Sequence, residues 1–218
     1  MDLGIFGFDM GATNEQLVTT VASSEGTGAF AETNRPSALL QALLGRNDEQ
    51  IPDILCAADG IGPLEAALLD DAETLARHVA QGVDPLCSSE DGWSTLHLAA
   101  WAGSPSVIST LIKWGVWVDR PGGPSRRMTA LSLAVSAGHA TVTRQLLEAG
   151  ADPDVADGAG WTPLHMAAHL GDLHVVKLLL LAGADIHALC GDCTPLEIAI
   201  RERHRPLIAL LRQVGASD

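Results

Sequence analysis

A short motif recurs along most of this 218-residue chain at a nearly constant interval. Residues 92–97 (Gly-Trp-Ser-Thr-Leu-His) and 160–165 (Gly-Trp-Thr-Pro-Leu-His) are near copies, and diverged copies begin at Thr129 and Thr194. The aligned hydroxyl residues, separated by 35, 33 and 32 positions, are Ser94, Thr129, Thr162 and Thr194. A period of this size predicts a stack of small structural repeats, each contacting its neighbours in the chain.

Each copy of the motif is followed by two stretches with helical character. In the clearest copy, Thr162 suits an N-cap and Pro163 the first helical position, while Gly171 ends a short helix. The apolar residues Val175, Val176 and Leu179 then recur at helical spacing, which predicts a second helix with a buried stripe. A glycine that closes the second helix keeps the same period, at Gly82, Gly115, Gly150, Gly183 and Gly215.

Thr-Pro-Leu-His at 162–165, followed by Gly-Ala-Asp at 183–185, resembles the ankyrin repeat. The resemblance covers roughly residues 60–218 and implies an all-α fold, a solenoid of about five helix-turn-helix repeats with hairpin-like fingers. The expected repeats are residues 60–91, 92–125, 126–157, 158–190 and 191–218. Neither helix of a repeat can bury its apolar face alone, so the copies must stack.

The N-terminal stretch has a different composition. Residues 1–36 show no sustained periodicity, so we expect a flexible or partner-docking arm that limited proteolysis removes. Residues 37–59 predict a short helical cap on the first repeat. Ile5–Phe8 is too short for a membrane span, and its acidic surroundings do not fit a secretory signal. After the last repeat, which ends at Asp218, we expect no further module.

The chain is acidic, with a formal net charge of −14. Such a scaffold repels phosphate backbones, so we expect no nucleic acid among its partners, and basic protein segments become the favoured ones. Four cysteines without a secretory signal indicate a reducing, intracellular setting, either cytoplasmic or nuclear. No small-molecule substrate is expected.

Few residues suggest chemistry. Cys190 and Cys193 with His187 offer at most three clustered metal ligands, so we expect ordinary loop cysteines and neither metal nor cofactor. His97 and His165 occupy the histidine position of the motif, where the family resemblance implies a structural hydrogen bond at a helix start. Without a phosphate loop, a serine elbow or a paired-carboxylate signature, the chain is expected not to be an enzyme.

The resemblance places partner contacts on the finger tips and on the exposed ends of the first helices. Trp101 fills a position that the scaffold does not need, and tryptophan is enriched among interface hot spots, so we expect it to bind a partner. Trp93 and Trp161 have two open interpretations, since their rings either bind a partner or stiffen the adjacent finger. The partner-binding set predicted on these two regions is Trp93, Trp101, Met128, Trp161, His169 and Leu170.

The connection after the second repeat departs from the pattern. Its Pro-Gly-Gly-Pro turn predicts a protruding loop, in which Arg126 and Arg127 either meet an acidic partner or phosphate or belong to a tolerated insertion. Trp114 and Trp117 are expected to seal this longer connection. We therefore expect a non-catalytic protein–protein interaction module, an adaptor or subunit of a larger complex that binds through its concave face. The alternative is an acidic chaperone or inhibitor that shields a basic client protein.

Overall fold

The structure, a computed structural model, describes residues 62–89, 92–123 and 127–216. These residues belong almost entirely to one of two compact units, Gly62–Ser88 together with Gly92–Asp218. The predictions for the arm at 1–36, for the cap at 37–59 and for Arg126 lie outside the described residues. Within them, no helix is long and apolar enough to cross a membrane.

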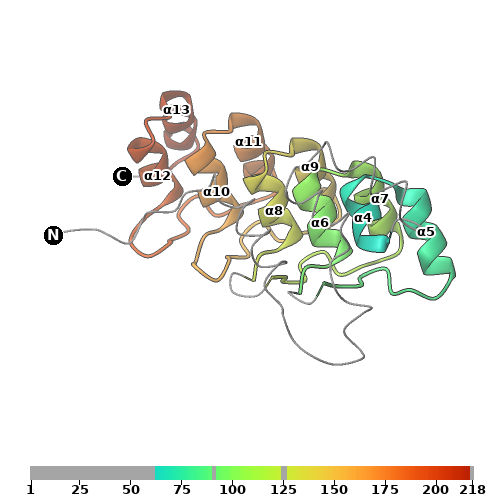
Figure 1. Cartoon of the computed structure of the whole chain (residues 1–218). Coiled ribbons are helices and arrows are strands. Elements are labelled where there is room, and N and C mark those ends of the chain that lie inside the picture. Colours follow the sequence, from blue (N-terminus) through green and yellow to red (C-terminus); the bar gives the residue numbers. More distant parts are fainter. Residues whose placement is uncertain (1–61, 90–91, 124–126, 217–218) are drawn as a thin grey trace, which may run out of the picture. The chain divides into compact units, whose positions relative to one another are not determined.

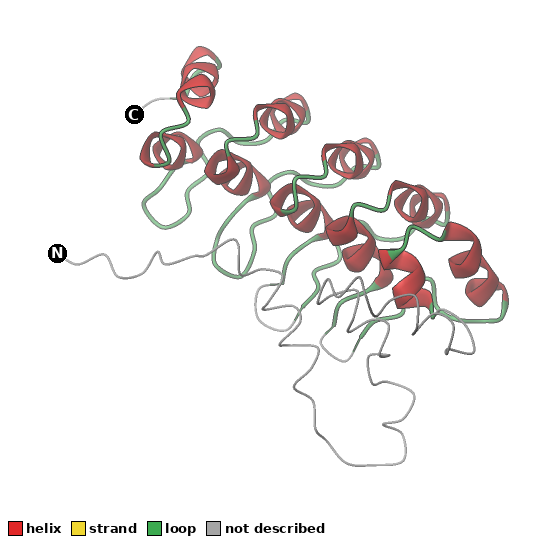
Figure 2. Ribbon diagram, turned by 45° about the horizontal axis from the view of Figure 1, so that its top comes forward, coloured by secondary structure: helices red, strands yellow, loops and turns green. Residues whose placement is uncertain are grey.

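Five helix pairs make up the described part of the chain. The first helices of the pairs are α4 (Pro63–Leu68), α6 (Thr95–Ala102), α8 (Ala130–Ser136), α10 (Pro163–Leu170) and α12 (Pro195–Arg201). The second helices are α5 (Ala72–Ala80), α7 (Pro105–Lys113), α9 (Ala140–Glu148), α11 (Leu173–Leu181) and α13 (Arg205–Gln213). All the secondary-structure elements assigned among these residues are α-helices, which confirms the all-α prediction. Figures 1 and 2 show the first helices in one row and the second helices in another.

The start of each first helix follows from its capping residues. The Thr129 hydroxyl accepts the Ser132 N–H at 3.2 Å, which satisfies one of the free donors at the start of α8. At α12 the capping is reciprocal, because Thr194 Oγ1 accepts the Glu197 N–H at 3.2 Å while the Glu197 carboxylate accepts the Thr194 N–H. Proline at the first position of α10 and α12 removes a donor that no helical carbonyl could satisfy.

The predicted second-helix stripes are confirmed as the core of the stack. The most deeply buried members, each fully buried, are Val107, Ile108, Leu111, Leu146, Val175, Val176 and Leu179. The first helices contribute both leucines and small residues to the same core; the small ones include Ala99, Ala100, Ala134, Ala167, Ala168 and Ala199, and fully buried leucines are Leu96, Leu131, Leu164 and Leu196. The small side chains let neighbouring first helices approach closely.

Two histidines join successive repeats where the helices of a pair meet. His139, the N-cap of α9, donates from Nε2 to the Trp101 carbonyl of the preceding repeat at 3.0 Å. His204, the N-cap of α13, makes the same bond to the His169 carbonyl at 2.9 Å. Each ring packs against the glycine that ends the first helix of the preceding repeat. A Cβ added at Gly103 would lie 2.5 Å from the His139 ring, and a Cβ added at Gly171 would lie 2.6 Å from the His204 ring.

The fingers are short antiparallel pairings without full strands. Isolated β-bridges join Ser88 with Ser94, Gly122 with Met128, and Cys190 with Cys193. Aspartates link one finger to the next. Asp119 Oδ1 accepts the Asp152 N–H at 3.1 Å, and Asp154 Oδ1 accepts the Asp185 N–H at 2.8 Å. Successive fingers are therefore tied to one another by hydrogen bonds from a backbone N–H to an aspartate side chain.

Candidate protein-binding site

One side of four of the first helices, α6, α8, α10 and α12, carries a stripe of three residues spaced four apart, which places them on the same helical face. The stripe of α6 is Trp93, His97 and Trp101, and that of α10 is Trp161, His165 and His169. The corresponding stripes of the other two repeats are Met128, Ser132 and Ser136 on α8 and Cys193, Glu197 and Arg201 on α12. In each stripe the first residue precedes the N-cap, the second completes the cap and the third lies at the helix end.

The histidine at the centre of the α6 stripe is a buried structural group. His97 Nε2 lies 2.9 Å from the Arg120 carbonyl, so this nitrogen carries the proton. Nδ1 is then an acceptor, and it receives the Ser94 N–H at 3.3 Å and the Ser94 hydroxyl at 2.7 Å. Burial lowers the pKa of His97 to about 4, although the carbonyl contacts favour the charged form.

His165 repeats this arrangement in α10. Its Nδ1 accepts the Thr162 N–H at 3.3 Å, and its Nε2 lies 3.2 Å from the Cys193 carbonyl. Burial lowers the pKa of His165 as well. The structural hydrogen bond expected for both histidines at the start of the helix is confirmed, and each ring also holds the next finger in place.

The prediction that the loop after the second repeat protrudes is wrong for the first half of this loop, which the structure describes. Gly122 N–H donates to the Met128 carbonyl at 2.8 Å, and Gly123 N–H donates to the Gly92 carbonyl of the preceding finger at 3.3 Å. A Cβ at Gly122 would lie 2.5 Å from the His97 ring, and one at Gly123 would lie 2.5 Å from the Trp93 ring. The glycine pair lets the backbone lie flat against these two rings. Residues 124–126 lie outside the described part.

This loop decides which of the predicted finger residues remain accessible. Trp93 is 6% exposed, which favours the interpretation that its ring stiffens the finger, and Met128, predicted to contact a partner, is only 7% exposed. The Trp93 indole is instead held edge-on to His97, with ring centroids 5.8 Å apart, beneath Gly123. Arg127 is exposed and has a left-handed backbone, with φ of 47°.

Trp161 is only half-buried, and it forms an aromatic group with the histidines of its stripe. Its ring centroid lies 6.2 Å from that of His165 and 5.9 Å from that of His169, both in edge-to-face geometry. His169 Nδ1 lies 3.4 Å from the Glu202 carboxylate of the following repeat. This distance suits a charged pair when the imidazole is protonated.

The accessible ends of the stripes lie next to one another on successive repeats. Trp101, Ser136 and His169 are half-buried, and Leu170 beside His169 is 40% exposed. We call Trp101, Ser136, Trp161, His169 and Leu170 the first-helix face. The structure holds its backbone firmly, because His139 and His204 bond the carbonyls of Trp101 and His169.

Sequence reasoning missed two features of this face. It assigned no role to His139, although a histidine recurs at the corresponding repeat position, His204, and this recurrence was an available signal. It also treated Trp161 and His169 as separate positions, whereas their spacing of twice four residues places both on one helical face.

The two cysteines of the pair face each other in the last finger, where an isolated β-bridge joins Cys190 and Cys193. Cys190 is buried, with Sγ 3.5 Å from the Ala159 carbonyl, and burial raises the pKa of its thiol. Within the described ranges, no group of three or more His, Cys, Asp or Glu side chains is arranged to hold a metal ion.

Comparison with known proteins agrees with this geometry. The family model for "Ankyrin repeats (3 copies)" matches residues 64–157 and 131–217. The B-cell lymphoma 3 protein homolog of Mus musculus is 32% identical over 161 residues, which cover 72% of this chain and 36% of that protein. The nuclear factor NF-kappa-B p105 subunit of Gallus gallus is 30% identical over 161 residues, covering 71% of this chain and 16% of that protein. The human SH3 and multiple ankyrin repeat domains protein 1 is 37% identical over 129 residues, covering 56% and 6%.

The chain thus spans about a third or less of the length of these relatives. Ankyrin repeats are protein-interaction modules without catalytic function of their own. Because the family match extends over well more than half of its residues, the chain belongs to the ankyrin repeat family.

Proposed function

We propose that this protein is a non-catalytic adaptor or a subunit of a larger complex, and that it binds a partner protein through the first-helix face. The observation that carries the proposal is the row of accessible side chains from Trp101 through Ser136 to His169 and Leu170 on three successive repeats. A row of this kind presents apolar and aromatic area from positions that the fold does not need for its core.

The rigidity of the face supports the proposal. Trp161 is already held against His165 and His169, so binding would freeze few additional torsions. Tryptophan buries a large area for two side-chain torsions, and its ring N–H adds a polar contact. Support also comes from the relatives, one of which is by its name a subunit of a nuclear factor.

The net charge of −14 favours a second candidate, an acidic chaperone or inhibitor that shields a basic client. The two candidates differ in their response to salt. A complex held mainly by long-range attraction weakens steeply as the Debye length shortens, whereas one held by a packed aromatic face does not.

The test is affinity purification with the full chain, followed by quantitative binding of the recovered partner to the wild type and to Trp101→Ala. We expect at least about tenfold weaker binding by the variant, because truncating a buried tryptophan anchor commonly costs 2 kcal/mol or more. Helical content and melting should change little, since the Trp101 side chain is half-buried.

Leu181→Ala is the matched control, because this leucine is 86% exposed at the end of the second helix α11. Its affinity should equal that of the wild type. Wild-type affinity in Trp101→Ala would move the binding site away from the first-helix face, and loss of folding would assign Trp101 to the core. Binding that disappears at high salt in a fully folded wild type would favour the basic-client function.

A further inference from the structure

Trp117 occupies a position of the repeat at which other repeats have an aspartate that accepts a backbone hydrogen bond. It follows the helix-closing glycine by two residues, as do Asp84, Asp152 and Asp185 in other repeats. Each of these aspartates accepts, through Oδ1, the backbone N–H of the residue two positions later. The three bonds are from Leu86 at 2.8 Å, from Asp154 at 2.9 Å and from His187 at 2.8 Å.

Tryptophan cannot make this bond, because its side chain carries no acceptor of this kind. Trp117 is 63% exposed, which contradicts the expectation that it seals the long connection, whereas Trp114 is 39% exposed. Helix α7 ends at Lys113 and the chain turns at Gly115, while the loop itself packs through Gly122 and Gly123 on the rings of His97 and Trp93. The second repeat therefore lacks a stabilising hydrogen bond and exposes a large indole to water.

The neighbours of Trp117 in the row are carboxylates. Asp84 precedes it by one repeat and Asp152 follows it by one repeat, while Asp119 lies two residues later in the same finger. Asp119 and Asp152 are in direct contact through the 3.1 Å bond between Oδ1 and the Asp152 N–H. Burial raises the pKa of Asp119, the hydrogen bond from the Asp152 N–H opposes this effect, and the charge of Asp152 adds to it.

The carboxylates of this row keep acceptor capacity for an outside donor. Asp84, Asp119 and Asp152 each use Oδ1, and within the described residues Oδ2 makes no hydrogen bond. The cations closest to Trp117 in the sequence are Arg120, three residues after it, and Lys113 at the end of α7. The three carboxylates of this row therefore outnumber the two cations of this turn.

We propose that the finger-base surface, formed by Trp117 together with Asp84, Asp119 and Asp152, binds an extended arginine-bearing segment of a partner protein. A guanidinium stacks on the exposed face of an indole and donates to flanking carboxylates at the same time. An apolar partner alone would leave these carboxylates desolvated and unpaired, which is costly. Charge complementarity thus selects a cationic occupant.

The spacing of the row selects an extended conformation. Packed helices lie about 8–10 Å apart, which sets the step from one repeat to the next. A polyproline II segment returns to the same side every third residue with a rise of about 3.1 Å per residue, or roughly 9 Å. An arginine at every third position would meet the finger-base surface in register.

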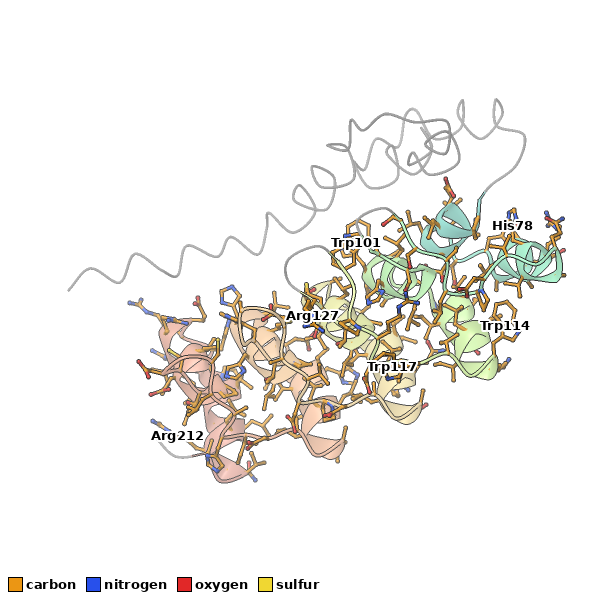
Figure 3. All side chains as sticks on the ribbon, turned by 90° about the horizontal axis from the view of Figure 1, so that it is seen from below. His78, Trp101, Trp114, Trp117, Arg127 and Arg212 are labelled. Atoms are coloured by element: carbon orange, nitrogen blue, oxygen red, sulfur yellow. The ribbon has the colours of Figure 1, made fainter. Side chains whose placement is uncertain are left out.

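This surface is separate from the first-helix face. Trp101 lies at the end of α6 and Trp117 beyond the end of α7, and the two helices of this pair run antiparallel. Figure 3 shows the two tryptophans well apart, with Trp117 on the side of the second helices. The inference therefore does not depend on the function proposed above, and the two can fail independently.

The experiment measures binding of labelled peptides to the full chain by fluorescence anisotropy at low salt. The probe consists of repeated Arg-Pro-Pro, and the matched control peptide of repeated Glu-Pro-Pro. We expect the arginine peptide to bind and the glutamate peptide not to bind. Trp117→Ala should weaken the binding about threefold or more, as an exposed cation–π contact of 0.5–1 kcal/mol with additional ring burial predicts. Trp101→Ala should leave it unchanged.

Trp117→Asp separates ring stacking from simple attraction. This variant adds a negative charge and restores the aspartate of the other repeats, so it should unfold at a higher temperature than the wild type while binding the arginine peptide more weakly. Stronger binding by Trp117→Asp would show that charge alone attracts the peptide and would overturn the role of the indole. Equal binding by wild type and Trp117→Ala, or binding of the glutamate peptide, would overturn the proposal.

Discussion

Acid should destabilise this fold through His97, well before its carboxylates become protonated. The ring is neutral in the folded state because it is buried, because Nε2 donates to the Arg120 carbonyl and because Nδ1 accepts from Ser94. Protonation would turn Nδ1 into a donor facing the Ser94 N–H, so the cap of α6 would lose its acceptor. The charged ring would also lie buried beside Gly122, with no room for water.

The magnitude follows from the pKa of His97, which falls from 6.5 to about 4. A folded-state pKa below the unfolded value contributes stability that is complete above 6.5 and is lost as the pH falls toward 4. At about 1.4 kcal/mol per pH unit, the full loss is about 3 kcal/mol, of which about 2 kcal/mol should be lost between pH 7 and pH 5. Over that interval, carboxylates of ordinary pKa remain ionised and contribute little.

The assay is urea unfolding of the wild type and of His97→Gln at pH 7 and pH 5. Glutamine at this position keeps an acceptor that can reach back to the N-cap but does not titrate. Whatever its absolute stability, the variant should lose about 2 kcal/mol less than the wild type between the two pH values. His174→Gln, at an exposed position on α11, serves as the matched control and should behave as the wild type does. Equal losses in wild type and His97→Gln would refute the assignment of the acid sensitivity to this ring.

Three further substitutions test the packing. Leu179→Ala should lower the free energy of unfolding by about 2–5 kcal/mol, since the side chain is fully buried, and a loss below about 1 kcal/mol would contradict the register of α11. Gly123→Ala should cost about 1–3 kcal/mol and change tryptophan fluorescence, because its φ is +82° and the methyl group would meet the Trp93 ring. Thr194→Ala should cost about 1 kcal/mol in thermal unfolding through loss of the cap of α12, whereas Thr194→Ser should retain it.

Features that depend on neighbouring residues in the sequence were predicted well. The cap at Thr162, the first-turn Pro163 and the break at Gly171 each act within one helical turn, so their effect can be recognised without knowing the rest of the fold. The stripe formed by Val175 and Leu179 is equally local, because helical spacing alone places both on one face.

Features that depend on a contact between repeats were predicted poorly. Trp93 is buried because Gly123, some thirty residues later, lies on its ring, and no local pattern reveals that contact. The roles of His139 and His204 depend on carbonyls in the preceding repeat. In both cases the missing information was which parts of one finger or turn lie against the repeat before it.

The two departures of the second repeat have a common physical consequence. With Trp117 in place of aspartate, the finger begins without the hydrogen bond that rigidifies the others. His97 and Trp93 of the preceding repeat hold this finger, through the Arg120 carbonyl and through close packing on Gly122 and Gly123. His165 makes the corresponding bond to the Cys193 carbonyl in a finger that keeps its aspartate, Asp185, so this anchoring does not depend on the residue at position 117. A finger anchored from the preceding repeat can therefore tolerate the loss of the aspartate bond, and the stack can fold with an indole exposed at this position.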